Sequence, residues 1–188
     1  GKEAIIILLD QTAAFGMVDH QILLSRLEDR FGVTGTALDW FSSYLSEREQ
    51  RVFIQDTASD PSPLKWGVPQ GSIVGPLLFI IYTAPIQDII KAHGFSTMLY
   101  ADDTQLYISM KPSDRDVTVK KLEICLQDVR NWMSSNHLVL NDSKMEVLHV
   151  SSAFRSCQEL SPITTNSIQA HPSPSVRNLG VIIDSHLN

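Results

Sequence analysis

The chain has 188 residues, of which 43% are hydrophobic and 19% are charged, a balance that can bury the core of one compact domain. Its formal net charge of −6 gives no broad basic surface, which counts against a protein that binds nucleic-acid phosphates by itself. The two cysteines, Cys125 and Cys157, are far apart and suggest neither a zinc site nor a disulfide framework.

The first predicted element is a strand at residues 4–9, a continuous aliphatic run typical of a strand buried on both faces. It ends at Asp10. An acidic residue at the end of a central strand is a usual place for site chemistry, although it can also simply terminate the strand. Neither this run nor the apolar run at 77–82 reaches membrane-spanning length, so we expect a soluble protein.

Apolar spacing predicts two helices next. The first carries an apolar stripe between residues 22 and 31 and stops at Gly32. Thr34 is positioned to cap the second, whose stripe lies between residues 38 and 45.

A strand at 51–55 and a polar, proline-containing hairpin loop at 56–63 are predicted after these helices. A rigid, glycine-flanked loop at 67–72 then leads into an apolar helix at 73–93, which Pro85 should kink or split.

The second half of the chain predicts a long amphipathic helix that starts at Ser113, with Cys125 as a small core residue beside its stripe. A strand at 145–150 follows. Residues 151–174 are rich in Ser, Thr and Pro and read as a loop with one short strand near residue 168. A final strand is expected at 176–184.

Between these halves, two short apolar strands at 97–100 and 105–108 are joined by a tight turn that carries Asp102 and Asp103. A solvated turn is one explanation, but two adjacent carboxylates repel each other unless a cation lies between them. If this hairpin packs beside the first strand, Asp10 joins the pair. Three such carboxylates suit two divalent cations about 4 Å apart, as in phosphoryl transfer, and their oxygen ligands favour Mg²⁺.

At this point the sequence resembles a known family. Tyr-Ala-Asp-Asp at 100–103 and Gly-Val-Pro-Gln-Gly-Ser-Ile-Val-Gly-Pro-Leu-Leu-Phe at 67–79 resemble the palm of reverse transcriptases from non-LTR (LINE-type) retrotransposons of a jockey-like branch. Supporting stretches follow in family order over nearly the whole chain: Leu-Leu-Asp at 8–10, Ala-Phe at 14–15, Val-Asp-His at 18–20, Trp-Phe-Ser-Ser-Tyr-Leu at 40–45, Trp-Met at 132–133, Leu-Asn at 140–141 and Asn-Leu-Gly-Val at 178–181.

The resemblance implies catalytic roles for five residues. Asp10 and Asp102 would be the main metal ligands, with Asp103 as a supporting carboxylate. The backbone carbonyl of Gln11 would complete one metal shell. Lys144 would donate a proton to the leaving pyrophosphate, whereas on composition alone it is an ordinary solvated charge.

The resemblance also implies substrate contacts. Phe15 falls where the family has an aromatic gate that rejects a ribose 2′-hydroxyl, with an ordinary core aromatic as the alternative. Gln70 and Gly71 would line the incoming nucleotide and template, and Tyr100 would contact the substrate. The segment 176–183 resembles the strand that supports the primer end.

The implied fold is α+β: a polymerase palm-like antiparallel sheet with helices packed on one face, and with fingers and thumb incomplete. Residues 1–150 would form the palm core, and residues 151–188 the loop and the start of the primer-supporting region. The implied activity is RNA-directed DNA polymerisation with Mg²⁺, or alternatively Mn²⁺, acting on an RNA template, a DNA primer and deoxynucleoside triphosphates. Non-LTR retrotransposons copy themselves at chromosomal sites, so the resemblance implies a nuclear protein that does not associate with a membrane.

The chain departs from the family at Gly16, where an Asp is usual, and at Gln11, where an aliphatic residue is usual. Glycine at position 16 should destabilise the turn into the next helix by on the order of 1 kcal/mol. Because fingers and thumb are not evident, we expect the chain by itself to be inactive. A catalytically inactive retrotransposon remnant is therefore an alternative, and an unrelated α+β protein with a chance Asp-Asp turn is a third.

Overall fold

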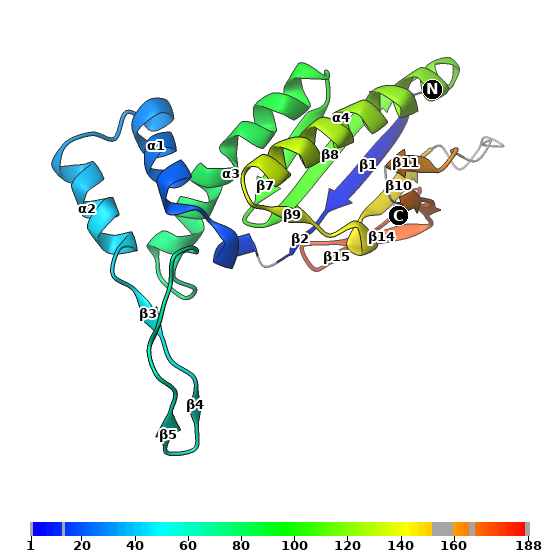
Figure 1. Cartoon of the computed structure of the whole chain (residues 1–188). Coiled ribbons are helices and arrows are strands. Elements are labelled where there is room, and N and C mark those ends of the chain that lie inside the picture. The colour runs from blue at the N-terminus through cyan, green and yellow to red at the C-terminus, as the bar shows by residue number, and fades with distance from the viewer. Residues whose placement is uncertain (1, 13, 152–159, 166–167, 187–188) are drawn as a thin grey trace. The chain divides into compact units, whose positions relative to one another are not determined.

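The computed structural model describes residues 2–12, 14–151, 160–165 and 168–186 (Figure 1). Packing divides the chain into two compact units. Unit 1 comprises Gly1–Thr12, Ala84–Ser135 and Val139–Asn188, and unit 2 comprises Ala13–Thr83 and Asn136–Leu138. The boundary expected at residue 150 stays a prediction, since this division reflects packing within the chain.

Unit 1 is built on a five-stranded sheet with the order β13-β10-β1-β8-β7. Its strands are β13 (Pro172–Ser173), β10 (Glu146–Val150), β1 (Glu3–Leu9), β8 (Asp103–Met110) and β7 (Ser96–Tyr100). All neighbours pair antiparallel except β10 and β13. The predicted antiparallel sheet is confirmed.

The central strand β1 alternates buried and half-buried residues along its length. The expectation that it is buried on both faces is therefore wrong. In an antiparallel sheet one face packs on the core while the other stays partly open, and successive side chains point to opposite faces.

Helix α4 (Arg115–Ser135) lies along this sheet (Figure 1) and follows a short 3₁₀ turn, η2 (Pro112–Asp114). The predicted apolar stripe is buried throughout: Val119, Leu122, Leu126, Val129 and Met133. Cys125 lies beside it as expected. Burial, and secondarily the charge of Asp128, raises the pKa of the Cys125 thiol to about 12, so it behaves as a small apolar core residue.

The remaining elements of unit 1 are short. They are β2 (Gln11–Thr12) paired with β9 (Val139–Leu140), η3 (Asp142–Lys144), β11 (Ile163–Thr165) paired with β12 (Ile168–Ala170), and β14 (Ser175–Asn178) paired with β15 (Val181–Asp184). The predicted loop at 151–174 thus contains more strand than expected. Its residues 152–159 and 166–167, Cys157 among them, lie outside the described residues.

The single final strand expected at 176–184 is wrong, because β14 and β15 form a hairpin. Leu179 and Gly180 make its turn, with φ of 47° and 85°. Two successive positive φ angles are what a two-residue hairpin turn requires, and the Asn-Leu-Gly sequence was the signal for it.

Unit 2 begins with η1 (Ala14–Met17), α1 (His20–Phe31) and α2 (Thr36–Leu45). Helix α1 starts after Asp19, whose carboxylate accepts two backbone N–H groups, and it ends at Gly32 as predicted. The cap of α2 is Gly35 instead of the predicted Thr34. Gly35 has φ 58° and ψ −140°, a conformation that fixes the helix start through the backbone and is readily adopted only by glycine.

The chain after α2 forms a narrow two-stranded arm (Figure 1). Its strands are β3 (Glu49–Gln50) with β6 (Ser62–Pro63), and β4 (Phe53–Ile54) with β5 (Thr57–Ala58). The predicted strand at 51–55 and the predicted loop at 56–63 are therefore the two sides of one hairpin.

Helix α3 (Val74–Ala92) runs without interruption through Pro85, so the predicted split does not occur. The Arg26 guanidinium donates to the carbonyl of Tyr82, three residues before the proline, and so gives this part of the helix a hydrogen bond from outside it. By length and composition alone α3 could cross a membrane. Five of its side chains are, however, fully buried in the protein, as in a core helix: Leu78, Phe79, Tyr82, Ile86 and Ile90.

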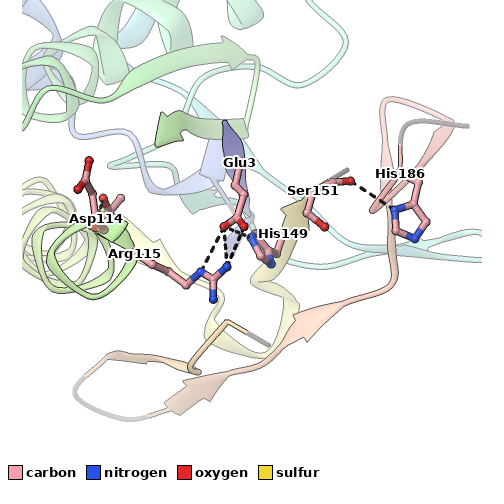
Figure 2. A network of polar contacts seen from close by, with 7 residues as sticks. Glu3, Asp114, Arg115, His149, Ser151 and His186 are labelled. Atoms are coloured by element: carbon pink, nitrogen blue, oxygen red, sulfur yellow. Dashed lines mark hydrogen bonds and ion pairs between the residues drawn. The ribbon is translucent and has the colours of Figure 1, made fainter. Parts of the chain in front are cut away.

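A buried ionic network joins three elements of unit 1 (Figure 2). Arg115, at the start of α4, lies 2.8 Å from both oxygens of Glu3 on β1. His149 Nε2, on β10, is 3.0 Å from Oε2 of the same carboxylate. Burial by itself would raise the pKa of Glu3, but the hydrogen bonds and charges of Arg115 and His149 outweigh it and hold that pKa below its usual range.

We predict that Glu3→Gln lowers the free energy of unfolding by about 2–4 kcal/mol at neutral pH, because it removes the buried negative charge that Arg115 and His149 face. A carboxylate with a lowered folded-state pKa stabilises the protein above the ordinary glutamate pKa of about 4.3, and this contribution is lost as pH falls through the folded-state value. Urea denaturation across that range measures both effects. The exposed Glu28→Gln is the control, and a Glu3→Gln deficit that persists undiminished in acid would contradict the assignment.

Candidate functional site

The pairing of β1 with β8 brings the first carboxylates together. Leu9 pairs with Thr104, so Asp10, just after β1, lies beside Asp103, which opens β8. Asp10 and Asp103 line one cavity of about 410 Å³. The hairpin of β7 and β8 thus packs beside β1. The sequence-based prediction that Asp10 lies near Asp102 and Asp103 required this packing.

The charges of these residues act on one another. The pKa of Asp103 is raised, first by burial and then by the negative charges of Asp102 and Asp10. Among the residues that the structure describes, no three His, Cys, Asp or Glu side chains form a ready metal-binding group. The metal-ligand roles of Asp10, Gln11, Asp102 and Asp103 therefore stay predictions.

The Asp10 carboxylate forms an ion pair with a lysine side chain. Lys144 Nζ lies 3.3 Å from Asp10 Oδ2, and the side-chain amide of Asn141 donates to the same oxygen over 3.3 Å. The backbone N–H of Asn141 also donates to the Asp10 carbonyl at 2.9 Å. Lys144 is thus a partner of the predicted catalytic carboxylate, although its side chain remains 66% exposed.

The turn that carries Lys144 is fixed from helix α4. Arg130 donates through both terminal nitrogens to the two oxygens of Asp142, at 2.8 and 2.6 Å. Ser143 donates to the Asn141 side-chain carbonyl at 2.7 Å. The sequence predicted no site role for Arg130 or for Asn141. The signal that could have found them was a turn of hydrogen-bonding residues that follows a helix with an arginine near its end.

Gln11 has a side-chain role that the sequence did not indicate. Its amide is 5% exposed and donates through Nε2 to the backbone carbonyl of Asp102, 3.3 Å away. Its Oε1 is buried without a hydrogen-bond partner in the described part of the chain. Ala101, next to Asp102, has φ 52°, which is unusual for a residue other than glycine, so this bond braces a strained turn.

The other predicted substrate contacts lie in unit 2, except Tyr100, which is on β7 and 59% exposed. Phe15, Gln70 and Gly71 line one cavity of about 240 Å³ with Pro69 and Pro76. The structure therefore brings these three predicted residues together, while their substrate roles stay predictions. Phe15 is half-buried and stacks on Phe79, with ring centroids 4.8 Å apart.

Backbone hydrogen bonds fix the glycine-flanked loop against the segment that carries Phe15. Gly67 N–H donates to the Val18 carbonyl at 2.8 Å, and Val68 N–H donates to the Phe15 carbonyl at 2.9 Å. Gly67 has φ 89°, and a Cβ added there would lie 3.1 Å from the backbone of Gly16. Only glycine meets both conditions.

The start of α3 is tied to the same loop. The Ser72 hydroxyl accepts the Gly75 N–H at 2.9 Å and donates to the Pro69 carbonyl at 2.9 Å. Tyr44, from α2, donates to that hydroxyl at 3.0 Å. This contact gives a structural reason for the Trp-Phe-Ser-Ser-Tyr-Leu stretch, which carries Tyr44 to the loop.

Gly16 replaces the Asp that is usual in the resembled family, and the structure has room for either residue. A Cβ added at Gly16 meets nothing within 4 Å, and no left-handed φ is present there. The glycine is therefore not required by packing.

The chain matches the family model described as reverse transcriptase (RNA-dependent DNA polymerase) over residues 1–183. It belongs to the reverse transcriptase family. It is 27% identical over 191 residues to a probable RNA-directed DNA polymerase from transposon BS of Drosophila melanogaster, covering 96% of this chain and 20% of that protein. It is 26% identical to the RNA-directed DNA polymerase from mobile element jockey of Drosophila funebris, covering 95% and 19%.

This reverse transcriptase chain thus spans about a fifth of the length of the curated relatives it matches. Among solved structures it is similar to apo telomerase from Candida tropicalis, with a TM-score of 0.69, 14% identity, and coverage of 99% of this chain and 35% of that one. That similarity confirms the palm-like α+β fold, and the relatives confirm the predicted resemblance to jockey-like retrotransposon polymerases.

We predict opposite effects of alanine at two glycines of unit 2. Gly75→Ala places a Cβ 2.5 Å from the Pro69 carbonyl oxygen and should lower the free energy of unfolding by about 1–3 kcal/mol. Gly16→Ala fills open space and should raise it by about 0.4–1 kcal/mol, through the unfolded chain. Urea denaturation measures both. Equal effects of the two substitutions would contradict the close approach of α3 to the loop.

We also predict that Asp103→Asn stabilises the chain at neutral pH by roughly 0.5 kcal/mol, because it removes repulsion from Asp102 and Asp10. A carboxyl group with a raised folded-state pKa loses stability as pH rises through that value, so the gain should vanish in acid. Thermal melts at several pH values measure it, with the exposed Asp56→Asn as control. If Asp103→Asn is less stable than the wild type at neutral pH, the predicted repulsion of Asp103 by Asp102 and Asp10 is contradicted.

Proposed function

We propose that this chain is the catalytic palm of an RNA-directed DNA polymerase, which joins a deoxynucleotide to a primer 3′-hydroxyl and releases pyrophosphate. The observation that carries the proposal is the register of β1 against β8, which puts Asp10 beside Asp103 with Lys144 on Asp10. The family, whose named members here are RNA-directed DNA polymerases, supports it.

Members of this family generally use divalent metal ions. Here we propose Mg²⁺, with Mn²⁺ as a substitute, held by Asp10, Asp102 and Asp103. The donor set fits: burial, and then the negative charges of Asp102 and Asp10, raise the pKa of Asp103, and hard oxygen ligands suit such ions. When bound, such ions lower the pKa of an attacking hydroxyl and neutralise charge on the leaving group.

The chain's own residues serve the transfer in distinct ways. The Lys144 side chain is largely exposed, so Nζ can move from Asp10 to a departing pyrophosphate and donate a proton there. Arg177 lines the same cavity and adds a second positive charge for an anionic substrate. Asn141 holds the Asp10 carboxylate through its side-chain amide and the Asp10 backbone carbonyl through its backbone N–H, so the carboxylate need not move when Lys144 leaves.

In unit 2, the cavity lined by Phe15, Gln70 and Gly71 would receive the incoming nucleotide. A ring at Phe15, held by stacking on Phe79, would exclude a 2′-hydroxyl by contact with the sugar and so select deoxynucleotides. Sequence information would come from pairing with the RNA template, with the protein contacting backbones. Since the net charge is −6, we propose that fingers and thumb regions of a longer protein supply the basic contacts.

Primer extension on an RNA template with Mg²⁺ tests the proposal, using this chain both alone and with the sequence that flanks it. Extension should fall on the order of 10²–10³-fold in Asp102→Asn, which loses a charge needed at the reacting phosphate. The exposed Asp116→Asn, in the first turn of α4, is the matched control. Absence of any extension that depends on Asp102 would favour the inactive-remnant alternative.

A further inference from the structure

A partly buried hydrogen bond links the sheet to the β14–β15 hairpin. Gln105 Nε2, on β8, donates to Asn178 Oδ1, at the end of β14, over 2.7 Å. Gln105 is 7% exposed and lies two residues after Asp103, whereas Asn178 is half-buried. A side-chain amide as buried as that of Gln105 is costly unless it has a hydrogen-bond partner, and Asn178 supplies one.

The hairpin is held at both of its ends. At the base, Ser185 N–H donates to the Pro174 carbonyl at 3.0 Å, and Ser151 N–H, just after β10, donates to the Ser185 carbonyl at 3.1 Å. At the turn, Gln105 holds Asn178. Between these points the hairpin borders the 410 Å³ cavity, whose lining includes Arg177, Asn178 and Leu179 together with Asp10 and Asp103.

The hairpin contributes its turn end to that cavity. Val181 and Ile182, on β15, are 63% and 62% exposed, whereas Val176, on β14, is buried. Because successive strand residues point to opposite faces, Val181 and Ile182 lie on different faces of the hairpin. The cavity wall is formed by Arg177, Asn178 and Leu179, so the position of this turn end relative to Asp10 and Asp103 sets the shape of the cavity.

We infer that Gln105 is a positioning residue, which fixes the β14–β15 hairpin relative to Asp10 and Asp103 and thereby keeps the cavity wall in the shape that binds the primer–template. This inference rests on the proposed polymerase function. Gln105 itself touches no reacting atom. It acts through Asn178, which lies directly before the two-residue turn at Leu179 and Gly180.

Two measurements test it on Gln105→Leu and Asn178→Leu, each of which removes the bond. Asn178→Asp is the conservative variant, because its carboxylate still accepts from Gln105. Hydrogen exchange of the backbone amides at 175–184 should accelerate several-fold in the two leucine variants and remain near wild type in Asn178→Asp, with exchange in α4 unchanged in all. The control is Gln127→Leu, which breaks an amide pair of the same chemistry, Gln127 to Asn131 at 2.8 Å, on the exposed side of α4.

The second measurement is primer extension by the chain with its flanking sequence. The KM for primer–template should rise about 2- to 10-fold in the leucine variants, the factor that corresponds to one hydrogen bond, while kcat changes little. Unchanged exchange at 175–184 overturns the inference, and so does accelerated exchange with an unchanged KM. If the wild type extends no primer, the proposed function fails, and the exchange measurement still decides whether Gln105 holds the hairpin.

Discussion

The register of β1 against β8 is the constraint on which the candidate site depends. Leu9 opposite Thr104 brings the end of one strand to the start of the other, so that Asp10 and Asp103 become neighbours although 93 positions separate them. Because strand side chains alternate between faces, a slip of one residue would turn the buried face of β1 outward. The same hydrophobic pattern that buries Ile5, Ile7 and Leu9 therefore also fixes where the carboxylates meet.

Repulsion among these carboxylates is the cost of that register, and the surrounding residues limit it. Lys144 places a positive charge on Asp10, and Arg130 orients the turn that carries Lys144 through Asp142. At Asp103, burial and then the charges of Asp102 and Asp10 raise the pKa of the carboxyl group. The arrangement is stable in a folded chain and still leaves unneutralised negative charge where a divalent cation would be bound, which agrees with the chemistry proposed for the family.

The sequence predicted the parts of this architecture that follow from periodicity and motif. The buried stripe of α4, the hairpin of β7 and β8, and the strand β1 ending at Asp10 could all be found that way. Errors occurred where the backbone decided the outcome. Gly35 starts α2 through its φ and ψ, and a two-residue turn at Leu179 converts one expected strand into a hairpin. The spacing of apolar residues indicates neither the backbone angles of Gly35 nor the turn at Leu179.

The side-chain contacts that the sequence did not reveal share one property: in each, a polar side chain acts on another residue of the site. Gln11 holds the Asp102 turn, Asn141 holds Asp10, and Gln105 holds Asn178. Each interrupts or directly follows an apolar run, where a polar residue is costly unless it has a partner. Such positions could be flagged from sequence, but the partner could not be named, because it lies between 73 and 131 positions away in the chain.

The resemblance to the family points to the carboxylates, the glycine-flanked loop and the stretches that hold Asn141 and Asn178, but it does not indicate the hydrogen bonds that fix their geometry. Gln11 shows the difference. It stands where an aliphatic residue is usual in the resembled family, and it gains a hydrogen bond to the Asp102 carbonyl while leaving its own Oε1 without a partner among the described residues. A bond kept at that cost, beside a turn strained at Ala101, is better explained by positioning of the turn than by stability of the fold.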